Sequence, residues 1–221
     1  MLDEKIRYLQ IAFNYDVNFV RHILPSLPKS ERIFIEAGTP YIKREGMNGI
    51  SLMRSLWQGY IVADLKTSDG AIGEVNLARR AGANAATILG SSPTESLDLF
   101  IAACEDAGID AMIDMIGVGD PLDVMMHLKK PPAVAILHRG RDEEGTRGKV
   151  IQYRHVNRIR SKFDVLISAA GGVDLKEARS AIFNGASIVV VNLVQPGDNW
   201  AGIPSDTNVG GLALEFLTTI S

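Results

Sequence analysis

Two acidic side chains and one basic side chain follow a short apolar run in the first third of the chain. The run Tyr60–Ala63 is rich in β-branched and aromatic residues, which is typical of a buried strand. Asp64, Lys66 and Asp69 come directly after it. Side chains two residues apart lie on the same side of an extended strand, so we expect the first two charges to point the same way. Charges at the mouth of a buried strand are costly unless they pair or do chemistry, so the segment indicates a proton-handling site.

Short apolar runs alternate with longer segments of helical periodicity along the chain. Such runs predict eight strands, at Leu9–Phe13, Ile33–Ile35, Tyr60–Ala63, Ala85–Leu89, Ala111–Met115, Ala133–Leu137, Val165–Ile167 and Ile188–Val191. Because a helix candidate follows each strand candidate, we expect repeated βα units and a parallel sheet. Eight units of similar size favour a single (β/α)8 TIM barrel over residues 1–221. A doubly wound open sheet is the alternative, but no glycine-rich phosphate loop follows the first strand.

Polar residues close most of these runs. They are Asn14, Glu36, Asp64, Thr87, Asp114, His138 and Asn192, whereas Ala169 closes the seventh run. The carboxyl ends of barrel strands surround one pocket, so we expect Glu36 and His138 to meet the segment Asp64–Asp69 there. The pair Gly171-Gly172 follows the seventh strand, where small residues would let backbone N–H groups approach an anion. Each residue alone is more often structural, so the prediction depends on their convergence.

The composition narrows the classes of partner and location. Hydrophobic residues make up 46% of the chain and the formal net charge is −3, so we expect a globular protein that does not bind nucleic acid. No apolar stretch is long enough to span a bilayer, and the first residues lack the pattern of a signal peptide. The single cysteine, Cys104, fits a reducing compartment and recurs with apolar neighbours at helical spacing. We therefore expect a cytoplasmic protein with a buried thiol.

The segment after the third predicted strand resembles a family signature. Its sequence, Asp64-Leu65-Lys66-Thr67-Ser68-Asp69, is similar to the Asp-x-Lys-x-x-Asp signature of the orotidine-5'-phosphate decarboxylase superfamily, whose members are dimeric (β/α)8 barrels. Glu36 lies in a Glu-Ala-Gly-Thr-Pro context that resembles the sugar-phosphate branch, and the strongest likeness is to 3-hexulose-6-phosphate synthase. Further similar segments are Thr87-Ile88-Leu89-Gly90, Asp114-Met115-Ile116-Gly117-Val118 and Ala170-Gly171-Gly172-Val173. The resemblance covers nearly the whole chain.

This resemblance implies an aldolase that joins ribulose 5-phosphate and formaldehyde, reversibly, into 3-hexulose 6-phosphate. Glu36 and Asp64 would hold a Mg²⁺ ion, which prefers carboxylate and substrate oxygens. The metal and Lys66 would stabilise an enediolate, and His138 would carry the proton. Asp69 would orient Lys66 and also reach the active site of the neighbouring subunit, so the resemblance implies a homodimer.

Three positions differ from the pattern of the synthases. Asn14 stands where the family usually has an aspartate at the substrate, and Asn192 follows the eighth strand where relatives have Gly-Arg and use it on the phosphate. Arg141 makes a His-x-x-Arg arrangement typical of the related 3-keto-L-gulonate-6-phosphate decarboxylases. With Gly171 and Gly172, Asn14 and Arg141 are our candidate substrate-binding residues. The decarboxylase, or a catalytically silent barrel that binds a metabolite, remains the alternative function.

Overall fold

The computed structural model describes residues 2–146 and 148–221, and its main feature is a closed ring of parallel strands. The strands are β1 (Tyr8–Phe13), β2 (Ile33–Ala37), β3 (Tyr60–Thr67), β4 (Ala85–Leu89), β5 (Asp110–Asp114), β6 (Val134–His138), β7 (Leu166–Ala170) and β8 (Ile188–Val194). Each strand pairs with the next in sequence, and β1 also pairs with β8. This last pairing closes the sheet, so the predicted (β/α)8 barrel is confirmed and the alternative of a doubly wound open sheet is excluded.

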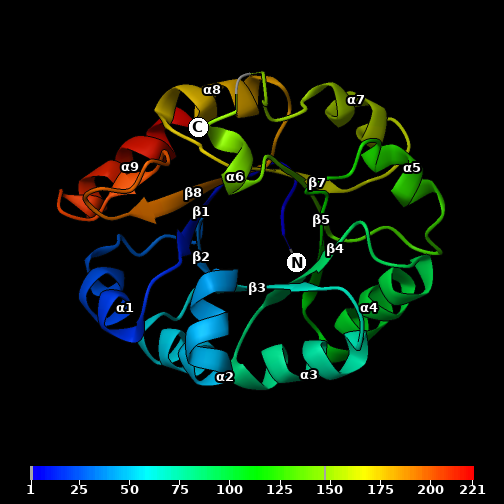
Figure 1. The fold of residues 1–221 in the computed structure, drawn as a ribbon, viewed down its shortest axis with the longest axis horizontal. Helices are drawn as coiled ribbons and strands as arrows, with labels where there is room; N and C mark the ends of the chain where they lie inside the picture. Colours follow the sequence, from blue (N-terminus) through cyan, green and yellow to red (C-terminus); the bar gives the residue numbers. More distant parts are fainter. Residues whose placement is uncertain (1, 147) are drawn as a thin grey trace.

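Helices form an outer ring around the strands (Figure 1). They are α1 (Val17–Ile23), the 3-10 helix η1 (Leu24–Ser26), α2 (Thr39–Leu56), α3 (Ala71–Ala81), α4 (Thr94–Ala107), α5 (Pro121–Met126), α6 (Arg141–Glu144), α7 (Arg154–Arg160), α8 (Leu175–Phe183) and α9 (Val209–Thr219). The connection from β6 to β7 carries two short helices, α6 and α7, instead of one. Within the described residues, no helix has the length and apolar character needed to cross a membrane.

The alternation of side chains along each strand divides the apolar residues into two groups. On β2, Ile33 and Ile35 pack outward against the helices, whereas Phe34 belongs to the smaller cluster inside the barrel. Glu36 follows with the same period of two and therefore also points inward, where it lines a pocket. The buried Cys104 lies in the outer cluster, as its apolar neighbours predicted.

Aromatic rings fill the amino end of the barrel. Tyr8 stacks on Phe34 with 4.6 Å between ring centroids, and Phe34 stacks on Tyr60 at 4.3 Å. The Tyr60 hydroxyl donates a hydrogen bond of 2.5 Å to Asp110. Each such ring pair contributes about 0.5–1.5 kcal/mol beyond the burial of its area. The rings close this end of the barrel interior, and the polar pocket lies at the other end, where the strands have their carboxyl ends.

Five strands, β2, β3, β6, β7 and β8, end later than the sequence predicts. Neighbouring strands explain the extensions of β7 and β8. β8 continues to Val194 because a short additional strand, β9 (Ile203–Pro204), pairs with Leu193 and Val194 in parallel. β7 ends at Ala170, which lies in register with His138 of β6. Both strands extend because a neighbouring backbone supplies hydrogen-bond partners, and the local apolar pattern does not reveal such partners.

Candidate active site

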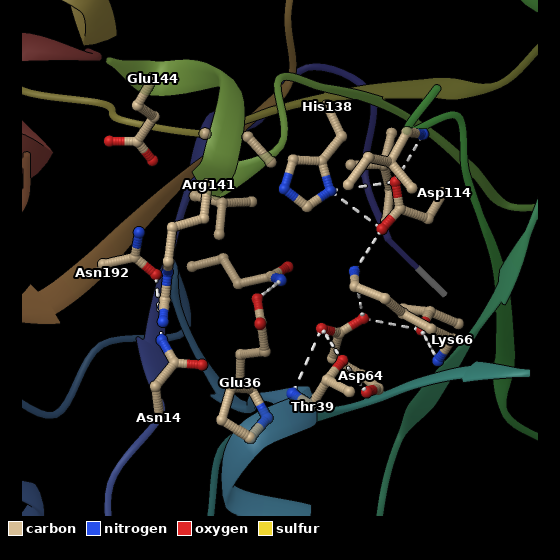
Figure 2. A pocket seen from close by; sticks show the side chains of 18 of the residues that line it. Asn14, Glu36, Thr39, Asp64, Lys66, Asp114, His138, Arg141, Glu144 and Asn192 are labelled. Carbon is tan, nitrogen blue, oxygen red and sulfur yellow. Dashed lines mark hydrogen bonds and ion pairs between the residues drawn. The ribbon is translucent and has the colours of Figure 1, made fainter. Parts of the chain in front are cut away.

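A pocket of about 330 Å³ opens at the carboxyl ends of the strands (Figure 2). Of the predicted site residues, those lining it are Asn14, Glu36, Asp64, Lys66, His138, Arg141 and Gly171. They come from β2, β3 and β6 and from the segments that follow β1, β6 and β7. The barrel thus gathers on one side residues that are up to 157 positions apart in sequence, from Asn14 to Gly171.

Lys66 enters the pocket from an irregular stretch of β3. Between Ala63 and Thr67, β3 advances four residues while the paired β4 advances two, from Ala86 to Ile88. Lys66 has a left-handed backbone with φ 48°, and its N–H donates to the Thr87 hydroxyl at 2.9 Å. The shared side of Asp64 and Lys66 is as expected, but a bulge produces it and not the regular extended strand that we assumed.

The ammonium of Lys66 lies between two carboxylates. Its Nζ is 3.2 Å from Asp64 Oδ1 and 2.5 Å from Asp114 Oδ2. Burial alone would lower the pKa of Lys66, but Asp64 and Asp114 raise it above its ordinary value. Lys66 is therefore a fixed positive charge in the pocket at neutral pH.

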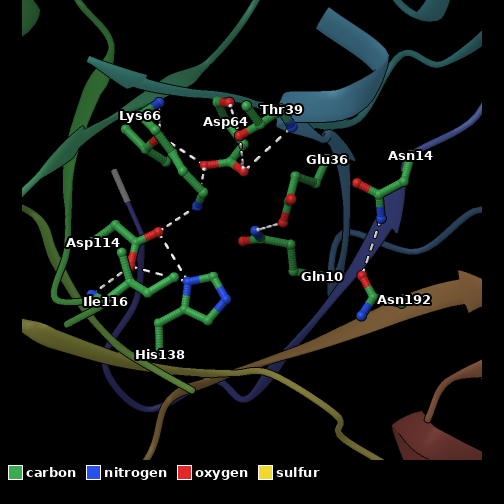
Figure 3. Close-up of polar contacts among 11 residues, drawn as sticks. Gln10, Asn14, Glu36, Thr39, Asp64, Lys66, Asp114, Ile116, His138 and Asn192 are labelled. Atoms are coloured by element: carbon green, nitrogen blue, oxygen red, sulfur yellow. Dashed lines mark hydrogen bonds and ion pairs between the residues drawn. The ribbon is translucent and has the colours of Figure 1, made fainter. Parts of the chain in front are cut away.

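Asp114, at the end of β5, also holds the imidazole of His138 (Figure 3). His138 Nδ1 lies 2.9 Å from Asp114 Oδ2, and Asp114 Oδ1 accepts a hydrogen bond of 3.0 Å from the N–H of Ile116. Burial would raise the pKa of Asp114, but His138 and Lys66 lower it to about 2. In turn, burial would lower the pKa of His138, but Asp114 raises it. The carboxylate thus stays ionised and directs the ring, leaving Nε2 for the pocket.

Two threonines fix the carboxylate of Asp64. The hydroxyl of Thr39, at the start of α2, donates to Asp64 Oδ2 at 2.7 Å, and the hydroxyl of Thr87 donates to Asp64 Oδ1 at 2.8 Å. Sequence reasoning assigned no role to Asp114, Thr39 or Thr87. Two of them closed predicted strands, so their place at a strand end was the available signal, but neither belonged to a charged motif.

The carboxyl group of Glu36 has a pKa close to neutral pH. Gln10 Nε2 donates to Glu36 Oε2 at 2.5 Å, while Gln10 Oε1 is buried without a hydrogen-bond partner among the described residues. Burial and the nearby Asp64 raise the pKa of Glu36 to about 7. Figure 2 shows the carboxyl groups of Glu36 and Asp64 both directed into the pocket. Two carboxylates and an orphaned amide oxygen form an oxygen-rich set that suits Mg²⁺, which uses one or two protein carboxylates together with substrate oxygens. Three-residue metal clusters are absent from the described part of the chain.

The opposite side of the pocket is polar and carries one cation. Asn14 Nδ2 donates to Asn192 Oδ1 at 3.1 Å, so two of the three residues that differ from the family pattern contact each other across the paired strands β1 and β8. Arg141 lies over the ring of Trp200, with its guanidinium carbon 4.5 Å from the ring centroid. Figure 2 shows the side chain of Arg141 across the pocket from Lys66 and Asp114.

The two glycines after β7 have different surroundings. Gly171 has φ 102° and lines the pocket, and an added Cβ would lie 1.9 Å from the carbonyl oxygen of Arg139. Gly172 does not line this pocket, and its Cβ would meet the side chains of Arg139 and Glu144. Close approach to the Arg139 backbone thus requires a glycine at 171, whereas the positive φ of 63° favours a glycine at 172. The expectation of an anion cradle included neither reason.

Asp69 lies outside this pocket. It is exposed, and Lys66 is oriented by Asp64 and Asp114 in its place. Within the described residues, no ion pair joins Asp69 to Lys66 of the same chain. The expected orientation of Lys66 by Asp69 is therefore not seen within one chain, and a role for Asp69 at a neighbouring subunit stays a prediction.

Fold and pocket together define a (β/α)8 barrel with a carboxylate–lysine–histidine site at the carboxyl ends of its strands. The chain belongs to the Orotidine 5'-phosphate decarboxylase / HUMPS family, whose model matches residues 8–192. The family resemblance predicted from the Asp-x-Lys-x-x-Asp segment is thereby confirmed.

Curated relatives support a narrower likeness. The chain is 39% identical, over 97% of its length, to "Bifunctional enzyme Fae/Hps" of Methanosarcina barkeri, and 38% identical, over 79%, to the protein of that name from Methanocaldococcus jannaschii. It covers 53% and 44% of these two proteins, so it spans about half the length of the curated relatives it matches.

Solved structures show the same fold. The structure of 3-hexulose-6-phosphate synthase from Salmonella typhimurium has a TM-score of 0.79 at 23% identity, with 96% of this chain and 98% of that chain covered. The structure of KGPDC from Streptococcus mutans has a TM-score of 0.74 at 20% identity, with 97% of each chain covered.

Proposed function

We propose that this chain is an aldolase that interconverts 3-hexulose 6-phosphate with ribulose 5-phosphate and formaldehyde. The observation that carries the proposal is the chain of contacts from Asp64 through Lys66 and Asp114 to His138. It places a fixed positive charge beside a histidine whose other nitrogen is free for proton transfer. The names of the relatives at 38–39% identity support the same activity.

The residues suggest a division of roles. In the direction of synthesis, His138 Nε2 takes the proton from C1 of ribulose 5-phosphate, and the electrons of that C–H bond form an enediolate. The ammonium of Lys66 stabilises the negative charge that develops on the enediolate oxygens. The enediolate carbon then attacks formaldehyde, a carbon–carbon bond forms, and His138 returns the proton to the new hydroxyl oxygen. Asp114 holds the ring so that Nδ1 keeps its proton throughout.

Glu36 and Asp64 would hold the divalent cation that we propose as cofactor, Mg²⁺. Bound there, the cation would supply further positive charge next to the substrate oxygens. Two features favour it: the carboxyl groups of Glu36 and Asp64 face one pocket, and Gln10 Oε1 has no hydrogen-bond partner among the described residues. Thr39 and Thr87 keep the Asp64 carboxylate in one orientation.

A homodimer in the cytoplasm completes the proposal. Asp69 is exposed just beyond β3, at the rim of the pocket's end of the barrel, so it is available to a second subunit. Mixing a Lys66→Ala chain with an Asp69→Ala chain tests this: mixed dimers should regain part of the activity that neither variant has alone. No regain in demonstrated mixed dimers would exclude the shared site.

An assay of formaldehyde release from 3-hexulose 6-phosphate, with and without Mg²⁺, tests the main proposal. Release that depends on Mg²⁺ supports the aldolase. Carbon dioxide release from 3-keto-L-gulonate 6-phosphate would instead identify a decarboxylase, which Arg141 in the pocket favours. Turnover of neither compound would indicate a silent metabolite-binding barrel.

The matched variants for this assay are Lys66→Ala and Lys129→Ala. Lys129 is 86% exposed on the surface, so its removal should leave turnover unchanged. Lys66→Ala should abolish turnover while circular dichroism shows an intact fold. If Lys66→Ala only unfolds the chain, or retains full turnover, the assigned role of Lys66 is wrong.

A further inference from the structure

The loop that follows β8 lacks the cation expected of a phosphate site. Barrels of this kind frequently bind phosphate with the loops after strands seven and eight. Residues 195–202 contain no lysine or arginine, and they carry Asp198 and Trp200. The same end of the barrel must therefore obtain positive charge from another element if a phosphorylated substrate is to bind.

Arg141 is the cation available for this task. Of the cationic residues lining the pocket, Lys66 and His138 are both engaged by Asp114. Within the described residues, Arg141 forms no ion pair. A guanidinium offers planar, paired N–H donors that match the oxygens of a phosphate group.

Trp200 holds this guanidinium in place. The ring lies 4.5 Å from the guanidinium carbon, within the range of a cation–π contact. Its loop is fixed in turn by Asp198, which accepts hydrogen bonds from the Tyr15 hydroxyl and, at 2.7 Å, from the N–H of Gln195. The β8 loop thus contributes an aromatic platform where a direct cation is absent.

We propose that Arg141, positioned by Trp200, binds the phosphate group of the substrate. This inference rests on the proposed function for the identity of the substrate, but not for the presence of the anion site. The phosphate would lie at the side of Asn14, Asn192 and Arg141, and the reacting carbons would face Lys66 and His138 across the pocket (Figure 2).

Neighbouring acids make Arg141 necessary at this side. Asp142 and Glu144 also line the pocket, and their negative charge would repel a phosphate dianion that approached without a cation. Loss of the Arg141 charge therefore removes an attraction and also leaves this repulsion uncompensated. Loss of a charge-assisted hydrogen bond corresponds to a weakening of about 10- to 100-fold.

The test measures binding without turnover, by calorimetry with inorganic phosphate and with ribulose 5-phosphate. The variant is Arg141→Gln, and its matched control is Arg158→Gln. Arg158 is half-exposed and forms an ion pair with Asp120, the residue just before α5. We expect Arg141→Gln to weaken both ligands by about 10- to 100-fold, and the control to leave both unchanged. Equal binding by wild type and Arg141→Gln, equal weakening by both variants, or no binding of either ligand by the wild type would overturn the proposal.

Two further variants separate positioning by Trp200 from general damage. Trp200→Ala should raise KM for the phosphorylated substrate with little change in kcat, and Trp200→Phe, which keeps a ring face, should restore most of the affinity. A wild-type KM in Trp200→Ala would refute the role of the ring. Calorimetry measures phosphate affinity independently of turnover. A wild type that binds phosphate through Arg141 but has no activity would therefore refute only the proposed reaction, not the phosphate site.

Discussion

Replacing Asp114 by asparagine removes one charge from the centre of the proposed site while keeping its shape. The carboxylate is buried and contacts Lys66 Nζ at 2.5 Å and His138 Nδ1 at 2.9 Å. The gap between its folded-state pKa of about 2 and its ordinary value of 3.8 corresponds to about 2 kcal/mol of favourable interaction. We therefore expect Asp114→Asn to lower the free energy of unfolding by about 2 kcal/mol at neutral pH.

The same change should lower kcat far more than stability alone would predict. An asparagine oxygen can still accept from Nδ1, but it no longer favours the charged imidazolium that forms during proton transfer. General acid–base catalysis contributes about 10²- to 10⁴-fold, so we expect a loss of kcat in this range. Formaldehyde release measures the rate, and urea denaturation measures the free energy of unfolding.

Asp110→Asn provides the control on the same strand. Asp110 begins β5 and accepts a hydrogen bond from Tyr60 at the opposite end of the barrel, so the identical chemical change there should leave kcat unchanged. A kcat for Asp114→Asn within about threefold of wild type would refute the proposed link between Asp114 and proton transfer, because it falls far below the expected acid–base contribution.

Three further outcomes follow from the geometry. Burial opposes protonation of His138 but Asp114 raises its pKa, so NMR titration should give a pKa above about 6.5 in the wild type and a lower pKa in Asp114→Asn. The stability that this protonation adds is present below about pH 6.5 and is lost as the pH rises through the folded-state pKa. Mg²⁺ at 100 times its dissociation constant should stabilise the wild type by about 2.7 kcal/mol in thermal unfolding, and an equal gain in Glu36→Gln would remove Glu36 from the metal site. Gly171→Ala should lower the free energy of unfolding by at least about 2 kcal/mol, because Gly171 has a positive φ and lies against a backbone oxygen. Gly119 has open space around it, so Gly119→Ala should change the free energy of unfolding by no more than about 0.5 kcal/mol. Similar urea midpoints for the two variants would contradict this.

The barrel was predictable because its signals are local and repeated. Each strand needs an apolar run and each helix an amphipathic one, and the run Ile33–Ile35 shows how period-two alternation already assigns its neighbour Glu36 to the interior. The polar strand ends could then be assembled into one pocket by topology alone. Strand lengths were less predictable, since the extension of β8 depends on pairing with β9.

The contacts within the site were less accessible to sequence reasoning. Asp114 was visible as a strand end, but its contact with both Lys66 and His138 depends on the spacing of β3, β5 and β6 around the ring. Likewise, nothing in the order of residues indicates that Trp200 lies against Arg141, because 59 positions separate them in the chain (200 minus 141). Such pairs are set by tertiary packing, which a one-dimensional pattern does not encode.

The irregular backbone at Lys66 has a consequence for substitutions in this segment. Four residues of β3 occupy the length of two residues of β4 there, and the amine reaches Asp114 from that looped-out position. A chain that carried the same six letters on a flat, regularly paired strand would present its amine from a different height and angle. The contact between Lys66 and Asp114 therefore depends on the bulge as well as on the residues of the segment, so a change that flattened β3 would remove it even with Lys66 kept.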